Sequence, residues 1–141
     1  MVVAEGQKGR RAEAMGRASA SLHILVVDDD PSVGRAVQRM LRHLGHRVSL
    51  AHHGAMALDI DLSDPADLLV TDMNMPGMDG GELISLIRNR RLAVPIILMT
   101  GGALEDVPAE LCIDSKRIVI IKKPMTIEEI SSSIEAMLTE V

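Results

Sequence analysis

The sequence contains no Phe, Tyr or Trp at any of its 141 positions, so its core must close without aromatic rings. Ten methionines are present, and we expect them to fill irregular gaps in that core because the flexible Met side chain adapts to its surroundings. A methionine-rich groove that binds a partner is the alternative interpretation.

Other absences limit the class of protein. Cys112 is the single cysteine, which excludes a disulfide within the chain and fits a reducing, cytoplasmic location. No apolar run approaches the ~18 residues that cross a bilayer, so we expect no membrane-spanning segment and no membrane partner. The formal net charge of −5 disfavours direct nucleic-acid binding through a broad basic surface.

The composition is that of one globular domain, with 47% hydrophobic and 25% charged residues. Residues 1–21 mix Gly, Ala, Ser and charged residues without periodicity, which predicts a flexible leader, either native or added for expression. We therefore place a single domain at residues 22–141.

Five short apolar runs alternate with helical patterns along this domain. The runs are Ile24–Val27, Val48–Ala51, Leu68–Thr71, Ile96–Met99 and Ile118–Ile121. Four of them are almost continuously hydrophobic, which is typical of strands buried on both faces of a parallel sheet. The second run is flanked or interrupted by Arg47 and Ser49, which is more typical of an edge strand.

Helix signals lie between these runs. Asp30 and Pro31 predict the N-cap and the first residue of a helix that ends at Gly45. The other signals are capping-box pairs at Asp79 with Glu82 and Thr126 with Glu129, a weaker helical pattern over Ala55–Asp61, and a short or mobile fourth helix within Gly101–Ser115 that begins near Val107. Alternating strands and helices predict an α/β fold, a doubly wound parallel sheet with helices on both faces.

Polar residues follow four of the five predicted strands. They are Asp28, Asp29 and Asp30 after the first strand, Asp72 after the third, Thr100 after the fourth and Lys123 after the fifth. The carboxyl ends of parallel strands share one edge of the sheet, where ligands of doubly wound folds bind. Taken singly, each residue has an ordinary explanation as a helix cap, a turn residue or a solvated charge, but their joint occurrence at one edge indicates a site.

The adjacent carboxylates of that edge repel one another, and a bound cation would offset the repulsion. Mg²⁺ suits them because it prefers oxygen ligands and keeps several waters. Asp30 is the exception, since a helix N-cap accounts for it without any role in the chemistry.

Four segments, in order and at the expected spacing, resemble the receiver domain of response regulators. They are Ile24–Pro31 (ILVVDDDP), Asp72–Gly80 (DMNMPGMDG), Pro95–Gly101 (PIILMTG) and Lys122–Pro124 (KKP). The resemblance covers residues 22–141 and implies a five-stranded flavodoxin-like sheet of strand order 2-1-3-4-5.

The resemblance also implies the chemistry of two-component signalling. Asp72 would accept a phosphoryl group from a sensor histidine kinase or a histidine phosphotransfer protein. Mg²⁺ would be held by Asp28, Asp29, Asp72 and the backbone carbonyl of Asn74. Thr100 would hydrogen-bond a phosphoryl oxygen, and Lys123, placed by a cis bond to Pro124, would pair with Asp72 and then with the phosphate. Such a domain catalyses only its own modification, so we do not expect a conventional enzyme.

One position departs from the family pattern. An aromatic residue commonly stands three positions before the strand-five lysine, where this sequence has Ile120. Either Ile120 and the segment 101–115 transmit a reduced conformational change, or the domain mainly receives and passes on phosphate. No output domain follows residue 141 in this sequence, so we expect the response to be delivered by protein contact, by phosphorelay or by a region of a longer protein.

Two other functions remain as alternatives. Asp28-Asp29-Asp30 loosely fits the Asp-x-Asp start of haloacid-dehalogenase-like phosphatases, in which the first Asp is the nucleophile. A phosphorylation-independent interaction module is the second, and the missing aromatic residue is its only support. The downstream target is not identified by the sequence under any of these interpretations.

Overall fold

The computed structural model describes residues 21–91, 93–102 and 117–139. Its strands are β1 (His23–Val27), β2 (Arg47–Ala51), β3 (Leu68–Asp72), β4 (Ile96–Thr100) and β5 (Ile118–Lys122). Its described helices are α1 (Pro31–His43), α2 (Gly54–Ser63), α3 (Gly80–Arg90) and α5 (Ile127–Thr139). The predicted fourth helix and residues 1–20 of the predicted leader lie outside the described residues.

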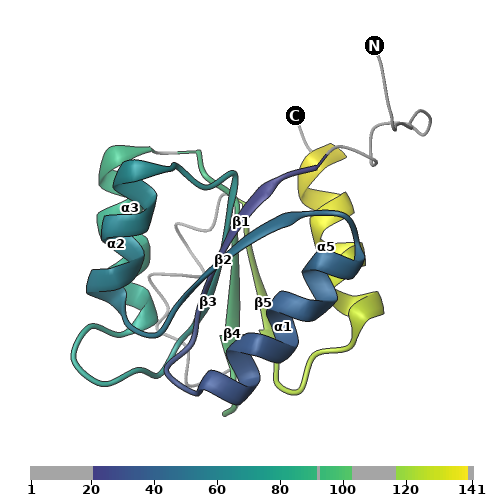
Figure 1. Ribbon diagram of the computed structural model, residues 1–141, viewed down its shortest axis with the longest axis horizontal. Helices are drawn as coiled ribbons and strands as arrows, with labels where there is room; N and C mark the ends of the chain where they lie inside the picture. Colours follow the sequence, from purple (N-terminus) through teal and green to yellow (C-terminus); the bar gives the residue numbers. More distant parts are fainter. Residues whose placement is uncertain (1–20, 92, 103–116, 140–141) are drawn as a thin grey trace.

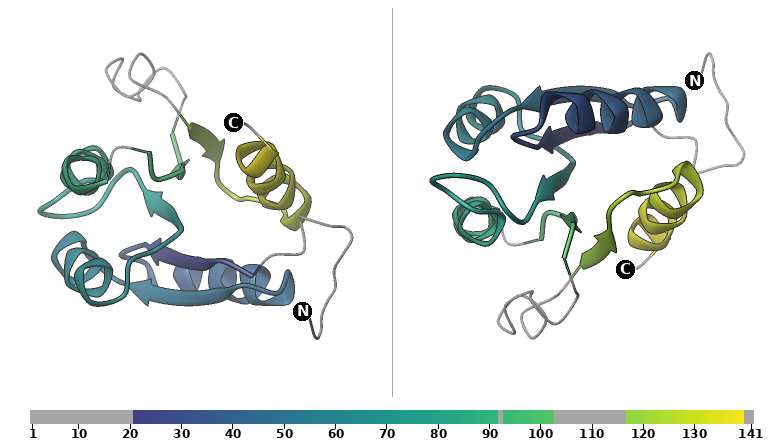
Figure 2. Two further views of the ribbon diagram at one scale, coloured as in Figure 1. Left: turned by 90° about the horizontal axis from the view of Figure 1, so that it is seen from above. Right: turned by 90° about the horizontal axis from the view of Figure 1, so that it is seen from below.

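The strands form one parallel sheet in the order β2-β1-β3-β4-β5, which confirms the predicted 2-1-3-4-5 topology. Helices α1 and α5 cover one face of the sheet, and α2 and α3 cover the other (Figures 1 and 2). The second strand therefore lies on one side of β1, and the third and later strands lie on the other, so the strand order reverses at β1. In doubly wound folds a ligand binds at the carboxyl ends of the strands near such a reversal.

Alternate residues of the central strands feed two separate cores. In β1, Leu25 and Val27 pack toward α2 and α3, whereas Ile24 and Val26 pack toward α1 and α5. All four are fully buried. The near-continuous apolar runs of the sequence thus exist because both faces of each central strand need apolar side chains.

Methionine contributes to both cores, as predicted. Met73 and Met75 are buried on the α2/α3 side, and Met99, Met125 and Met137 are buried on the α1/α5 side. These side chains take interior positions that no aromatic residue is present to fill.

The helix boundaries follow the predicted capping signals. The Asp30 carboxylate caps α1 by accepting hydrogen bonds from the backbone N–H groups of Ser32 and Val33. The predicted capping box of α3 is complete, with Asp79 and Glu82 each accepting from the other's backbone N–H. At α5, Thr126 and Glu129 make the equivalent pair of bonds.

Two predictions need correction. The predicted helix at Ala55–Asp61 is longer, because His53 caps it at the N-terminus through a hydrogen bond from the Met56 N–H and the helix continues to Ser63. β5 is not buried on both faces, since Ile121 is its only buried residue. Its place as an edge strand of the sheet explains this partial exposure. β2, the other edge strand, matches its prediction.

Among the described residues, none of the helices combines the length and the apolar character that crossing a bilayer requires.

Candidate functional site

The predicted site residues meet at the carboxyl edge of the sheet. Asp72 and Thr100 are the last residues of β3 and β4, while Asp28 and Lys123 directly follow β1 and β5. Since β1, β3, β4 and β5 are parallel neighbours, these four positions lie along one edge. Asp28, Asp72 and Thr100 are 0%, 5% and 2% exposed, so their polar groups stand at the end of the core and not on an open surface.

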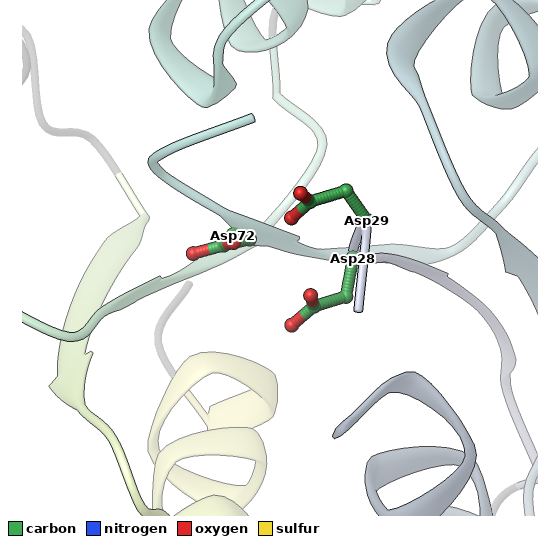
Figure 3. Close-up of side chains that lie close together, drawn as sticks. All are labelled: Asp28, Asp29 and Asp72. Atoms are coloured by element: carbon green, nitrogen blue, oxygen red, sulfur yellow. The ribbon is translucent and has the colours of Figure 1, made fainter. Parts of the chain in front are cut away.

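Three carboxylates form the centre of the site. Asp28, Asp29 and Asp72 each offer an oxygen, and these oxygens all lie within 4.8 Å of one another. Figure 3 shows Asp28 and Asp29 extending from the end of β1 beside Asp72 at the end of β3. Asp29 is exposed, whereas the other two are buried, so the cluster is open to solvent on the side of Asp29.

Lys123 supplies a positive charge to this cluster. Its Nζ donates to Asp28 Oδ2 at 2.9 Å and lies 3.3 Å from Asp72 Oδ1. The ammonium group therefore contacts Asp72, as the resemblance implied, and also Asp28, a contact that was not predicted. The bond between Lys123 and Pro124 is cis, as predicted.

Asp28 has both carboxylate oxygens engaged within the protein. Oδ1 accepts a hydrogen bond from the backbone N–H of Asp30 at 2.9 Å, and Oδ2 accepts from Lys123. A fully buried carboxylate with both oxygens occupied is poorly placed to attack a substrate. This arrangement speaks against the phosphatase alternative, in which Asp28 would be the nucleophile.

The surroundings of Asp72 disfavour its charged form. Burial raises the pKa of Asp72 above its ordinary value, although the positive charge of Lys123 opposes this effect. The negative charge of Asp28 raises the pKa further, while hydrogen bonds from Lys123 and from the Asn74 backbone lower it. The net upward direction means that an additional cation beside Asp72 would favour its charged form.

The pKa of Lys123 moves in the direction that keeps it charged. Burial alone lowers this pKa, but the hydrogen bond from Lys123 to Asp28 and the charge of Asp72 outweigh burial and raise it. Lys123 is thus a permanent cation between two carboxylates.

Thr100 completes the edge on the β4 side. Its Oγ1 accepts a hydrogen bond from the backbone N–H of Gly102 at 3.2 Å, which leaves the hydroxyl proton available to another acceptor. Its backbone carbonyl accepts from the Lys123 N–H at 2.8 Å. The second bond ties the position of the lysine to the end of β4.

The loop from Met73 to Asp79 carries the remaining predicted ligand, the backbone carbonyl of Asn74. The Met73 N–H donates to the Met99 carbonyl at 2.8 Å, and the Gly80 N–H donates to the Met73 carbonyl at 2.9 Å. The Asn74 side chain is exposed, and this residue follows Asp72 by only two positions. The Asn74 backbone also donates a hydrogen bond to Asp72, so this residue lies beside the carboxylate cluster.

The donor set suits a hard divalent cation. Clustered carboxylate oxygens and a backbone carbonyl are the ligands that Mg²⁺ prefers, and an open side leaves room for the waters that it retains. Lys123 offsets only part of the negative charge of three acids, which favours a further cation. Asp28, Asp29, Asp72 and the Asn74 carbonyl are the residues that would hold it.

Sequence reasoning missed two features of this site. It did not find the contact between Lys123 and Asp28, because a motif specifies which residues meet but not which oxygen lies closer. It also passed over Gly80, where an added Cβ would lie 2.4 Å from the Asp72 carbonyl oxygen. The signal was present in the sequence, since a glycine at the first position of a predicted helix often marks a close backbone approach.

Comparison with known proteins gives a consistent result. A family model described as the response regulator receiver domain matches residues 24–135. The chain is 37% identical over 119 residues to the response regulator MprA of Mycobacterium bovis, a match that covers 84% of this chain and 51% of that protein. It is 36% identical over 118 residues to the MprA of Mycobacterium avium. The chain thus spans about half the length of these curated relatives.

Solved structures show the same architecture. The chemotaxis protein CheY4 of Vibrio cholerae superposes with a TM-score of 0.77 at 25% identity, over 84% of this chain and 99% of that one. The receiver domain of the hybrid histidine kinase CckA gives a TM-score of 0.68 at 27% identity, over 83% and 99% of the two chains.

Proposed function

Because the chain belongs to the receiver domain family of response regulators, we propose that Asp72 accepts a phosphoryl group from the phosphohistidine of a sensor kinase or phosphotransfer protein, with Mg²⁺ as the helper ion. The family match supports a role in two-component signalling. The observation that supports the finer proposal is the position of Asp72. Its buried carboxylate lies 3.3 Å from Lys123 Nζ, and it offers an oxygen within 4.8 Å of those of Asp28 and Asp29.

In the transfer step, the bond between phosphorus and the donor histidine nitrogen breaks as a bond forms between phosphorus and a carboxylate oxygen of Asp72. The barrier to such a transfer is set mainly by alignment and by neutralisation of charge on the phosphoryl oxygens. Mg²⁺, when bound, would neutralise part of that charge.

The residues of the chain would supply the remaining stabilisation. Lys123 exchanges its contact with Asp72 for one with a phosphoryl oxygen and keeps Asp28 as its anchor. The Thr100 hydroxyl donates its proton to a second phosphoryl oxygen while its oxygen still accepts from Gly102. Water later attacks phosphorus and releases inorganic phosphate, so the domain regenerates Asp72 and turns over no separate substrate.

The test uses a small phosphoryl donor. Incubation with acetyl phosphate and Mg²⁺, followed by intact-mass measurement, should show one added phosphate on the wild-type protein and none on Asp72→Asn. Added phosphate that persists in Asp72→Asn but disappears in Asp28→Asn would instead support the phosphatase-like chemistry. No added phosphate with either acetyl phosphate or phosphoramidate would support the phosphorylation-independent module.

We further propose that the domain works in the cytoplasm and responds through protein contact or phosphorelay. The position of Ile120 supports a muted conformational change, because this half-buried side chain packs on the α2/α3 core without a ring that could move toward Thr100. Amide spectra with and without beryllofluoride distinguish the two modes. Large shifts across residues 101–125 would indicate transmission through this region, and shifts confined to the carboxylate cluster would indicate phosphorelay.

A further inference from the structure

The loop between β3 and α3 is anchored by three methionines. Met73 and Met75 are 8% and 7% exposed and belong to the core beneath α2 and α3, and the half-buried Met78 packs against the same core. The peptide units between these anchors include the Asn74 carbonyl. The packing of these methionines therefore limits how far the Asn74 carbonyl can move.

Met78, the third of these methionines, contacts helix α2. Gly54 is the first residue of α2, and a Cβ added there would lie 2.5 Å from Sδ of Met78 and 3.1 Å from its Cβ and Cγ. Rotation of the flexible Met78 side chain can relieve the contact with Sδ, but Cβ and Cγ are attached close to the loop backbone and must shift by a few tenths of an ångström. Met78 therefore packs closely on the backbone of α2. Gly54 is not in the left-handed region of backbone conformation, so close approach, and not backbone geometry, is what requires a glycine here.

The same end of the loop makes a second close contact, two residues after Met78. Gly80, the first residue of α3, is packed so closely that an added Cβ would lie 2.4 Å from the Asp72 carbonyl oxygen. Gly80 thus packs the α3 end of the loop against its β3 end, and the first turn of α2 contacts the loop at Met78. The loop has little freedom to shift relative to the carboxylates.

We propose that the contact between Gly54 and Met78 is a positioning contact for the phosphoryl-acceptor site, in which the N-terminus of α2 sets the place of the loop that presents the Asn74 carbonyl to the metal ion. This inference rests on the proposed function. Gly54 and Met78 touch neither metal nor phosphate, and they act through the loop backbone. Substitution of groups that hydrogen-bond to metal ligands typically changes metal affinity by about 10- to 100-fold, and Gly54 and Met78, which act one step further from the ligand, should fall at the lower end of that range.

The experiment compares Gly54→Ala, Met78→Ala and the double variant. Mg²⁺ affinity is measured by titration of amide resonances, and the rate of phosphate uptake from acetyl phosphate by intact mass. Gly54→Ala should weaken Mg²⁺ binding and slow uptake by about tenfold, because the new methyl group displaces Met78 and the loop with it. In the double variant the methyl group enters the space that Met78 vacates, and at least half of the loss, on a logarithmic scale, should be restored relative to Gly54→Ala.

Gly34→Ala is the matched control. A Cβ at this α1 glycine would lie 2.8 Å from Cδ1 of Leu50, which is also a contact with the end of a side chain but one that does not involve the loop. It should lower the thermal midpoint as Gly54→Ala does but leave Mg²⁺ affinity unchanged. If Gly54→Ala does not fold, Met78→Ala alone decides, with weaker Mg²⁺ binding expected.

The outcomes separate the two proposals. If the wild-type protein takes up phosphate at Asp72 but Gly54→Ala and Met78→Ala lose only stability, the positioning role is wrong and the proposed function stands. Failure of the double variant to recover affinity also overturns the positioning role. If the wild-type protein neither binds Mg²⁺ nor takes up phosphate, both proposals fall.

Discussion

The ammonium group of Lys123 lies 2.9 Å from Asp28 and 3.3 Å from Asp72, so the lysine is shared between two carboxylates that come from different strands. This bridge ties the ends of β1, β3 and β5 together before any phosphate or metal arrives. It also means that the lysine can change its partner at Asp72 without losing its anchor at Asp28.

The charge balance at Asp72 predicts that removing its charge stabilises the metal-free fold. A raised pKa means that ionised Asp72 is less favourable in the folded than in the unfolded protein, so stability is lost as the pH rises through the pKa of the folded state. At pH 7 without divalent ions, Asp72→Asn should therefore raise the thermal midpoint by on the order of a few degrees. The gain should shrink as the pH falls and Asp72 becomes protonated. Far-ultraviolet circular dichroism measures it, and a lower midpoint for Asp72→Asn at pH 7 would contradict the expected sign.

Metal binding should stabilise the wild-type protein through the same cluster. At a concentration about 100 times its dissociation constant, Mg²⁺ should add about 2.7 kcal/mol to the free energy of unfolding, and a chelator should remove that gain. Asp29→Asn should weaken binding by at least about tenfold. Asp59→Asn is the control, because this exposed carboxylate of α2 is outside the cluster. Equal Mg²⁺ stabilisation of both variants would place the metal elsewhere.

The close approach of Gly80 to the Asp72 carbonyl predicts a steric cost. Gly80→Ala should lower the free energy of unfolding by about 1–3 kcal/mol, since the atom in the way is backbone and cannot rotate aside. Gly101→Ala should cost far less, because nothing lies within 4 Å of a Cβ added there. Urea denaturation of the two variants provides the comparison, and similar losses for both would show that the backbone adjusts at Gly80.

Asp61 and Arg91 form a buried ion pair at the edge of the sheet opposite the carboxylate cluster. Breaking this pair should lower stability without changing phosphate uptake. Asp61, 3% exposed, accepts hydrogen bonds from Arg91 and from the Ala66 N–H, and it joins the end of α2 to the end of α3. Arg91→Met should cost about 1–3 kcal/mol because the buried Asp61 carboxylate loses its closest charged partner and keeps only the Ala66 N–H and the more distant Arg90, 3.9 Å away.

The exposed pair of Arg47 and Asp64 is the matched comparison for Arg91→Met. Although their oxygen and nitrogen lie 2.6 Å apart, the side chains are 61% and 49% exposed, and Arg47→Met should cost clearly less stability than Arg91→Met. Phosphate uptake by the folded fraction should be unchanged in both variants. Slower uptake by folded Arg91→Met would show that the far edge is coupled to the site.

Most of the fold and the composition of the site could be predicted from the sequence. Apolar runs and capping boxes specify strands and helix starts locally, which is why the starts of α1, α3 and α5 were correct. The length of α2 was missed because His53 is an uncommon cap and the helix carries no strong stop signal. The exposure of β5 could not be read from its apolar sequence, since exposure depends on what packs against an edge strand.

The finer geometry of the site was also beyond sequence. The contacts of Lys123 with two carboxylates depend on distances that differ by tenths of an ångström. The contact between Met78 and Gly54 joins residues from segments that are not consecutive in the chain. Such contacts depend on how the helices and strands pack against one another, so a local sequence pattern does not predict them.

The central claim is that Asp72, and no other carboxylate of the cluster, carries the phosphoryl group. Borohydride reduction cleaves an acyl phosphate and converts the modified aspartate to homoserine, which peptide mass spectrometry locates. After incubation with phosphoramidate and Mg²⁺, homoserine should be found at position 72 alone. Homoserine at position 28 or 29, or its absence from a protein that binds Mg²⁺ and is folded, would contradict the account.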